Sequence, residues 1–317
     1  MLPYIFLIIA FILLAKGADY FVEGASQIAR YCRVSQLFIG LSIAAIGTSA
    51  PEAAVSIKAS ITGVNGIALG NVIGSNITNI CLAIGIAALM KPLFFETSTI
   101  KKEMPFMVAA TVLMLLFGLN YSKGGSHLCI YSRAEGIIFL LFFIGFLFYL
   151  SRMAVRDRRN NQTVAQEEKY SIGKAIGLTI IGGAGIALGG HLAVVNAKIV
   201  ANMWGVSEKI IGITVVAFGT SIPEIVTAIV AVAKGKISIA IGNIVGSNIF
   251  NILFVLGIAA TISPISIESS VIFDILICLG ISLLFLLFSK IGKRFGKVYG
   301  IILVVCYILY VILLFHK

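Results

Sequence analysis

The chain alternates long apolar stretches with short polar ones along nearly its whole length. Each apolar stretch is long enough for a helix that crosses a bilayer, which needs about 17–25 predominantly apolar residues. The short runs between them hold most of the charged residues. This pattern predicts an all-α polytopic membrane protein with ten transmembrane helices, over residues 3–24, 35–60, 67–90, 104–120, 135–151, 173–197, 208–233, 237–262, 270–289 and 297–315.

Composition excludes a soluble globular protein. Of the 317 residues, 59% are hydrophobic and only 12% are charged, and the mean hydropathy is +1.07. A net charge of +11 is also typical of proteins that bind nucleic acid, but most of the Lys and Arg fall in loops on one side if the N-terminus lies outside, as the positive-inside rule requires. We therefore expect a multi-pass protein of the cell membrane with its N-terminus outside. Its environment is the lipid bilayer, and no nucleic acid and no obligate protein partner is expected.

The first half of the chain returns in the second half at a constant offset. Residues 47–52, Gly-Thr-Ser-Ala-Pro-Glu, return as Gly-Thr-Ser-Ile-Pro-Glu at 219–224. Residues 70–79, Gly-Asn-Val-Ile-Gly-Ser-Asn-Ile-Thr-Asn, return as Gly-Asn-Ile-Val-Gly-Ser-Asn-Ile-Phe-Asn at 242–251. The duplication predicts two related halves of one membrane domain.

Each half contains five expected spans, and because five is odd, the second half enters the membrane from the opposite side. The expected organisation is a first five-helix repeat over 1–151, a cytoplasmic linker over 152–172 and a second, inverted five-helix repeat over 173–317. Inverted repeats of this kind place an ion or substrate site near the bilayer midplane.

The first duplicated motif collects oxygen atoms at a predicted helix break. Pro51 has no N–H and disrupts a helix, so we expect backbone carbonyls around Ala45, Gly47 and Thr48 to lose their helical partners. Ser49 adds a hydroxyl, and Glu52 adds a carboxylate inside an apolar stretch, where a charge marks a functional site by default. Hard oxygen donors suit calcium and sodium. The second copy offers the same set: Ala217, Thr220, Ser221 and Glu224.

The second duplicated motif places small polar side chains on one helical face. Asn71, Ser75 and Asn79 are spaced by four residues and align on a helix, as do Asn243, Ser247 and Asn251. Such faces either join helices by hydrogen bonds or complete a cation site. Two copies in phase beside two buried glutamates favour the site.

The charge of the motifs limits the cargo. Glu52 and Glu224 bring two negative charges, and neither motif contains Lys or Arg. Two close carboxylates in a medium of low dielectric constant resist joint ionisation, but one divalent cation, several monovalent cations or two protons would neutralise them. Mutually exclusive occupancy by a divalent ion and several monovalent ions is the physical basis of an antiporter.

These motifs resemble the α-repeats of the cation/calcium exchanger superfamily, and in particular its prokaryotic sodium/calcium exchangers. The resemblance implies a core of the second, third, seventh and eighth helices around four cation sites, with long, tilted first and sixth helices that slide across it. It implies that Glu52 and Glu224 are central calcium ligands, with carbonyl donors from Thr48 and Thr220. The flanking sodium sites would use Ala45, Ser49, Ser75, Ala217, Ser221 and Ser247, and Asn79 and Asn251 would line the middle site.

One departure bears on the transported ions. At the position of Asn251, potassium-dependent members and some prokaryotic exchangers carry aspartate. Asparagine here argues against potassium co-transport and leaves open whether the middle site holds an ion or water. The short linker is typical of a prokaryotic exchanger without a large regulatory loop.

The predicted function is electrogenic Na⁺/Ca²⁺ antiport by alternating access, with Ca²⁺ and Na⁺ as transported ions and no cofactor. The alternative is a Ca²⁺/H⁺ antiporter that uses the same two glutamates; a passive cation channel is a third, weaker alternative. No enzyme motif is present, so we expect no enzymatic activity.

Two features of the first helix of each repeat have structural interpretations. Lys16, Asp19 and Glu23 are spaced three and four apart, so they share a helical face and can pair with one another. They do not recur in the second copy, which favours a structural role. The glycine-rich run at 182–185 lies within an apolar helix and predicts close helix packing.

Overall fold

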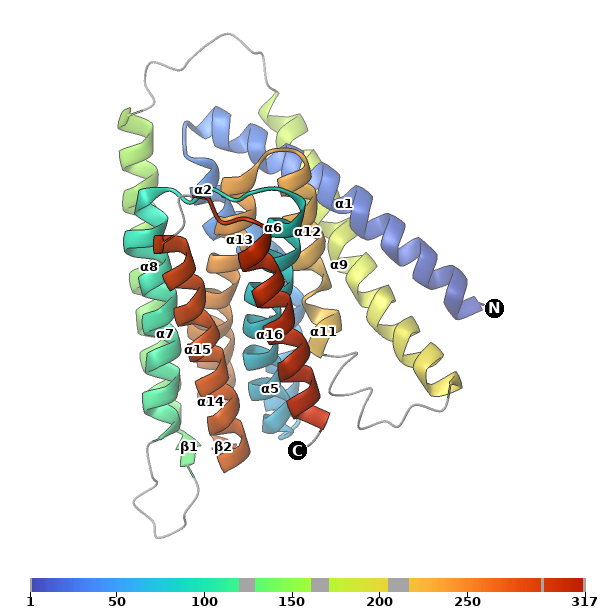
Figure 1. Cartoon of the computed structure of the whole chain (residues 1–317), viewed down its shortest axis with the longest axis vertical. Helices are drawn as coiled ribbons and strands as arrows, with labels where there is room; N and C mark the ends of the chain where they lie inside the picture. The colour runs from blue at the N-terminus through green and yellow to red at the C-terminus, as the bar shows by residue number, and fades with distance from the viewer. Residues whose placement is uncertain (1, 120–128, 161–170, 205–216, 292–293, 316–317) are drawn as a thin grey trace. The chain divides into compact units, whose positions relative to one another are not determined.

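The computed structural model describes residues 2–119, 129–160, 171–204, 217–291 and 294–315, and within these ranges the chain is almost entirely helical (Figure 1). The helices of the first half are α1 (Leu2–Cys32), α2 (Gln36–Ile39), π-helix η1 (Gly40–Ala44), α3 (Ala45–Thr48), α4 (Ala50–Ile61), α5 (Asn65–Thr78), π-helix η2 (Asn79–Ile84), α6 (Gly85–Met90), π-helix η3 (Thr99–Glu103), α7 (Met104–Gly118) and α8 (Arg133–Asn160).

The helices of the second half are α9 (Ile172–Met203), α11 (Ala217–Thr220), α12 (Ile222–Ala233), α13 (Ile237–Phe250), π-helix η5 (Asn251–Leu256), α14 (Gly257–Ile262), α15 (Ser269–Ile291) and α16 (Lys297–Phe315). The expectation of an all-α fold missed one small sheet, in which β1 (Cys129–Tyr131) pairs antiparallel with β2 (Ile265–Ile267), Cys129 opposite Ile267.

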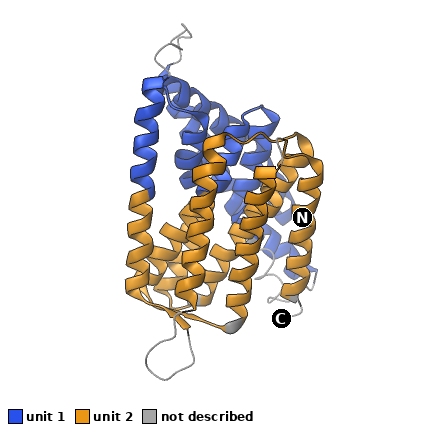
Figure 2. Cartoon of the chain, turned by 60° about the vertical axis from the view of Figure 1, so that its left-hand side comes forward, with its two compact units in different colours: residues 1–49, 146–246 blue, residues 50–145, 247–317 orange. Residues whose placement is uncertain are grey.

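The helices form two compact units, each of which contains segments from both halves of the sequence (Figure 2). Unit 1 contains residues 1–49 and 146–246, and unit 2 contains residues 50–145 and 247–317. The units therefore follow spatial contact and not the sequence repeat.

Unit 1 is built around the contact between the two longest helices, α1 and α9, which lie side by side (Figure 1). Glycines on both helices allow a close approach: a Cβ on Gly17 would lie 2.8 Å from Ile186 N, and one on Gly182 would lie 2.6 Å from Gly17 O. Ala10, Leu14 and Phe21 pack against Ile186 in the same cluster. The prediction that the glycine-rich run at 182–185 serves packing is confirmed for Gly182.

Unit 2 buries both polar and aromatic side chains. Helix α5 contacts α4 and η5, and Asn71, Asn76 and Asn79 on or next to α5 are each at most 4% exposed. Helix α15 and the chain before α16 meet the chain that follows α6 through edge contacts among Phe95, Phe285 and Phe295.

The two copies share local backbone features in detail. Ser49 lies between α3 and α4 with φ −85° and ψ 7°, and Ser221 lies between α11 and α12 with φ −86° and ψ −2°. Gly63 and Gly235, which follow α4 and α12, have φ values of +76° and +73°, a left-handed conformation that favours glycine at a helix end. The sequence duplication is therefore also a duplication of local structure.

The described residues include seven helices that are long and apolar enough to cross a membrane, or eight if the broken pair Gln36–Thr48 and Ala50–Ile61 is one span. Two of the ten expected spans are not among them. The expected span 104–120 corresponds to α7, which is only 15 residues long, and the first part of the expected span 208–233 lies outside the described residues.

Large apolar side chains face outward on these helices, while polar ones lie inside. Leu141 and Ile144 on α8 and Ile180 on α9 are each at least 60% exposed. A surface of this kind is stable against lipid and not against water. The chain is a multi-pass membrane protein.

The structure adds detail to two charged segments. The first part of the expected linker 152–172 is helical, because α8 continues to Asn160; residues 161–170 lie outside the described ranges. Asp19 and Glu23 do not pair with Lys16 but with Lys234 at the end of α12, at 2.8 and 3.7 Å. Helix spacing allowed an ion pair with Lys16 within α1, but the packing of α1 on α12 places Lys234 beside Asp19 and Glu23 instead.

Candidate cation site

Both motif glutamates occupy the first turn of a helix that begins after a break. Glu52 lies in the first turn of α4 and Glu224 in the first turn of α12, and both side chains are fully buried. Pro51 and Pro223 occupy early helical positions, where the missing N–H costs least. A helix N-terminus stabilises nearby negative charge, so the local fold supports an ionised carboxylate at each position.

In unit 1, residues of the first motif meet residues of the second copy. The hydroxyl of Ser49 donates to Glu224 Oε1 at 2.8 Å, and the hydroxyl of Thr48 donates to Asn243 Oδ1 at 3.1 Å. All four side chains are at most 1% exposed. Glycines permit this proximity, because a Cβ on Gly246 would lie 2.8 Å from Leu41 O and from Ala45 Cβ.

The expected release of the Ala45 carbonyl is wrong. Ser49 N donates to Ala45 O at 3.0 Å, which is an ordinary helical bond across the last turn of α3. The break falls after Thr48, so the Ala45 carbonyl keeps its helical partner.

In unit 2, the polar face of α5 meets the glutamate of α4. Asn71 Nδ2 donates to the Glu52 backbone carbonyl at 3.2 Å and to Ser56 Oγ at 3.0 Å. Ser75 Oγ lies 3.5 Å from Glu52 Oε1. Asn71 and Ser75 of this polar face therefore lie against α4.

Four asparagines in unit 2 form a reciprocal network. Asn76 Nδ2 donates to the backbone carbonyl of Asn248 at 3.4 Å, and Asn248 Nδ2 donates to the backbone carbonyl of Asn76 at 3.2 Å. Asn79 Nδ2 donates to Asn248 Oδ1 at 3.1 Å, and Asn251 Nδ2 donates to Asn76 Oδ1 at 3.2 Å. The network repeats the sequence duplication atom for atom.

This network dictates the orientation of the outer two amides. A backbone carbonyl only accepts, so Asn76 and Asn248 must each direct the nitrogen to the carbonyl and the oxygen to the next asparagine. Asn79 and Asn251 must then direct their nitrogens inward along the network. Their Oδ1 atoms are buried and have no hydrogen-bond partner among the described residues, and such an oxygen is expected to accept from water or bind a cation.

A change of helix type marks the same two positions. The π-helices η2 and η5 begin at Asn79 and Asn251. A short π-helix widens the turn and often occurs at functional sites. The asparagine oxygens therefore lie where the regular α-helix ends.

Eleven of the twelve predicted site residues are buried; for Ala217 the structure describes the backbone in α11 and not the side chain. The exposed fraction is 5% for Thr220 and at most 1% for the other ten: Ala45, Thr48, Ser49, Glu52, Ser75, Asn79, Ser221, Glu224, Ser247 and Asn251. Among the described residues no three His, Cys, Asp or Glu side chains cluster as metal ligands. The donors available are carboxylate, hydroxyl, amide and carbonyl oxygens, which is a set for hard cations.

Sequence reasoning missed two residues of this arrangement, Asn76 and Asn248. Both belong to the duplicated motif, so the signal was present. The spacing of four used to define the polar face passed over them, because each lies one residue after the serine of that face.

Comparison with known proteins identifies the family. The family model for the sodium/calcium exchanger protein matches residues 2–152 and 174–316. CaxA of Alkalimonas amylolytica, named as an antiporter, is 38% identical over 99% of this chain and 98% of its own length. The sodium/calcium exchanger MaX1 of Methanosarcina acetivorans is 33% identical over 99% of this chain and 98% of its own length.

Solved structures agree with the sequence relatives. The sodium-calcium exchanger NCX_Mj, soaked with Na⁺ and Ca²⁺, superposes with a TM-score of 0.83 at 31% identity, over 98% of this chain and 97% of that chain. The fold and the duplicated motifs define a membrane exchanger. The chain belongs to the sodium/calcium exchanger protein family.

Proposed function

We propose that this protein is a secondary-active antiporter that moves Ca²⁺ against Na⁺ across the cell membrane by alternating access. The observation that carries the proposal is the pair of buried glutamates, Glu52 and Glu224, each in the first turn of a helix after a break of the same geometry. Relatives named as sodium/calcium exchangers cover nearly the whole chain.

The proposed transport site uses the oxygen donors that the sequence singled out. Glu52 and Glu224 are the calcium ligands, helped by the carbonyls of Thr48 and Thr220. Ser49, Ser75, Ser221, Ser247, Ala45 and Ala217 serve the sodium ions, and Asn79 and Asn251 direct oxygens to a middle position. The support is the burial of these residues, the Ser49–Glu224 hydrogen bond and the buried amide oxygens.

Coupling to sodium is favoured over coupling to protons by the surroundings of the glutamates. The hydroxyl of Ser49 donates to Glu224 Oε1, and the N-terminus of α12 adds a positive dipole end. Both interactions offset part of the cost of burying a charged carboxylate. A site that keeps its charge binds metal cations in both half-cycles, whereas a Ca²⁺/H⁺ antiporter must protonate it.

The proposed architecture is ten spans in two inverted five-helix repeats, 1–151 and 173–317. The duplicated breaks at Ser49 and Ser221, the matching left-handed glycines and the matching π-helices η2 and η5 support it. The helices α1 and α9, which begin the two repeats, are the long helices that the resemblance implies.

Gradient-driven flux tests the coupling. Purified protein in Na⁺-loaded liposomes, diluted into choline buffer at fixed pH, should accumulate calcium-45 only while the outward sodium gradient lasts. Protein-free liposomes give the background. Uptake that ignores sodium but follows an imposed pH gradient would replace the proposal with Ca²⁺/H⁺ exchange, and uptake without any counter-ion would indicate a channel.

The proposed transport is electrogenic. If three sodium ions exchange for one calcium ion, each cycle moves one net charge, and a potassium diffusion potential set with valinomycin should change the initial uptake rate. An unchanged rate would indicate two sodium ions for each calcium ion.

A further inference from the structure

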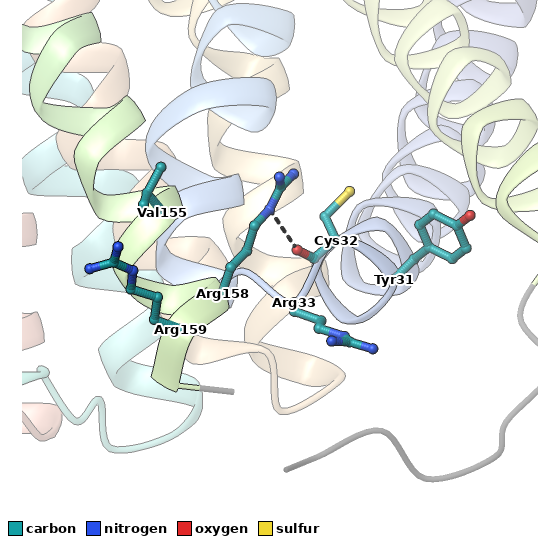
Figure 3. A pocket seen from close by; sticks show the side chains of 6 residues that line it. All are labelled: Tyr31, Cys32, Arg33, Val155, Arg158 and Arg159. Carbon is teal, nitrogen blue, oxygen red and sulfur yellow. Dashed lines mark hydrogen bonds between the residues drawn. The ribbon is translucent and has the colours of Figure 1, made fainter. Parts of the chain in front are cut away.

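A basic pocket outside the proposed transport site lies between the ends of two helices of unit 1. Its volume is about 510 Å³. The C-terminal end of α1 and the residue after it contribute Tyr31, Cys32 and Arg33; the end of α8 contributes Val155, Arg158 and Arg159 (Figure 3). Three of the six described lining residues are arginines, and none of these six is acidic.

The arginines are arranged by the fold. Arg158 reaches from α8 toward α1, where its Nε donates to the Cys32 carbonyl at 3.1 Å, and Arg33 and Arg159 lie on either side of it (Figure 3). A guanidinium has five N–H donors, and within the described part of the chain this bond engages only one of those of Arg158. Arg33 has a φ of +57°, a left-handed conformation that glycine would adopt at lower cost.

Asp157, the acidic residue of α8 beside Arg158, already accepts a hydrogen bond. Asp157 Oδ2 accepts from the backbone N–H of Ser35 at 2.9 Å, at the start of α2. The described lining residues carry three arginines against this one neighbouring carboxylate of α8, and such a lining suits a phosphate group, which arginine binds through paired N–H donors.

The position of the pocket suits a lipid better than a free phosphate. On α8 the apolar side chains Leu147 and Phe148 are exposed up to the start of the polar segment, where Arg152 stacks over the Phe148 ring at 4.6 Å. Tyr31 and Val155 at the pocket are each 56% exposed. Arginines next to exposed apolar side chains match a headgroup joined to acyl chains.

We propose that this pocket binds the phosphate headgroup of an anionic glycerophospholipid at the membrane surface, and that Arg158 and Arg159 are its main ligands. Basic pockets between transmembrane helices commonly hold anionic headgroups. The lipid would connect the ends of α1 and α8 within unit 1.

Native mass spectrometry of the purified full-length protein, titrated with phosphatidylglycerol in detergent, tests the proposal. Wild type should retain phosphatidylglycerol in preference to phosphatidylcholine. Each arginine removed should weaken binding roughly fivefold, so the double variant R158Q/R159Q should bind on the order of 25-fold more weakly. R156Q is the matched control: it removes the same charge from the same helix, outside the pocket, and should bind close to wild type and clearly more tightly than R158Q/R159Q.

Three results would overturn the proposal. The first is lipid binding by R158Q/R159Q as tight as by wild type. The second is an equal loss of binding in R156Q, which would indicate diffuse charge attraction. The third is full displacement of the lipid by millimolar inorganic phosphate, which would indicate a site for free anions. If the double variant does not fold, R159Q alone decides, because its side chain makes no hydrogen bond to a described residue.

Discussion

At the scale of single residues, the asparagine network explains how an uncharged amide can serve a cation site. Asn76 and Asn248 bind each other's backbone carbonyls, and this forces the amide oxygens of Asn79 and Asn251 away from the network. The sequence identified Asn79 and Asn251 as candidates but gave them no orientation, since orientation depends on partners from the other copy of the motif.

Replacing Asn248 with leucine should therefore affect ion binding as well as stability. N248L leaves Asn79 Nδ2 and the Asn76 carbonyl without partners in the interior, which costs about 1–3 kcal/mol of unfolding free energy. It also frees the Asn79 amide to rotate, so the calcium concentration for half-maximal uptake should rise several-fold.

The matched control is N196L, since Asn196 is also buried but donates to Leu192 O within its own helix. Calcium uptake kinetics should be unchanged in this variant. An unchanged half-maximal concentration in N248L, measured in folded protein, would exclude the positioning role.

At the scale of elements, the sequence predicted most helices and the two breaks, because apolar length and proline chemistry act locally. Three features depend on packing and were missed: the π-helices, the continuation of α8 to Asn160 and the pairing of Lys234 with Asp19. The pairing joins α1 to α12, which are distant in sequence, and the local spacing of Asp19 and Glu23 favoured Lys16 instead.

The contact between α1 and α9 predicts that two Gly→Ala substitutions in α9 change the free energy of unfolding in opposite directions. G182A places a methyl group against Phe21 N and Gly17 O, and such overpacking typically costs about 1–3 kcal/mol. G177A lies in the same helix with no described neighbour within 4 Å of its Cβ, so it should stabilise by about 0.5–1 kcal/mol. Thermal unfolding in detergent measures both, and equal shifts would contradict the packing argument.

At the scale of the whole molecule, the sequence predicted the class of protein and the duplication. The predicted count of ten spans is not reached when the described helices are judged by length and hydropathy alone. The described helices give seven or eight apolar spans because α7 is short and part of the expected span 208–233 lies outside the described residues. The ten-span interpretation depends on the repeat, which the matching breaks at Ser49 and Ser221 support.

Topology reporters test this interpretation. With ten spans and the N-terminus outside, the C-terminus is also outside, so alkaline phosphatase fused after Lys317 should be active and a green fluorescent protein there should be dark. The same reporters inserted after Asn160 should give the opposite result. A fluorescent C-terminal fusion would exclude the proposed orientation or the proposed count.

The central claim is that calcium crosses the membrane through the two motif glutamates, and sodium-driven calcium-45 uptake by matched variants tests it most directly. E52Q and E224Q should each lose uptake while remaining folded, because each removes a charge that a divalent cation needs. E135Q should keep it, since Glu135 is also buried but accepts from Ser132 at the start of α8. Full uptake by either E52Q or E224Q would contradict the account.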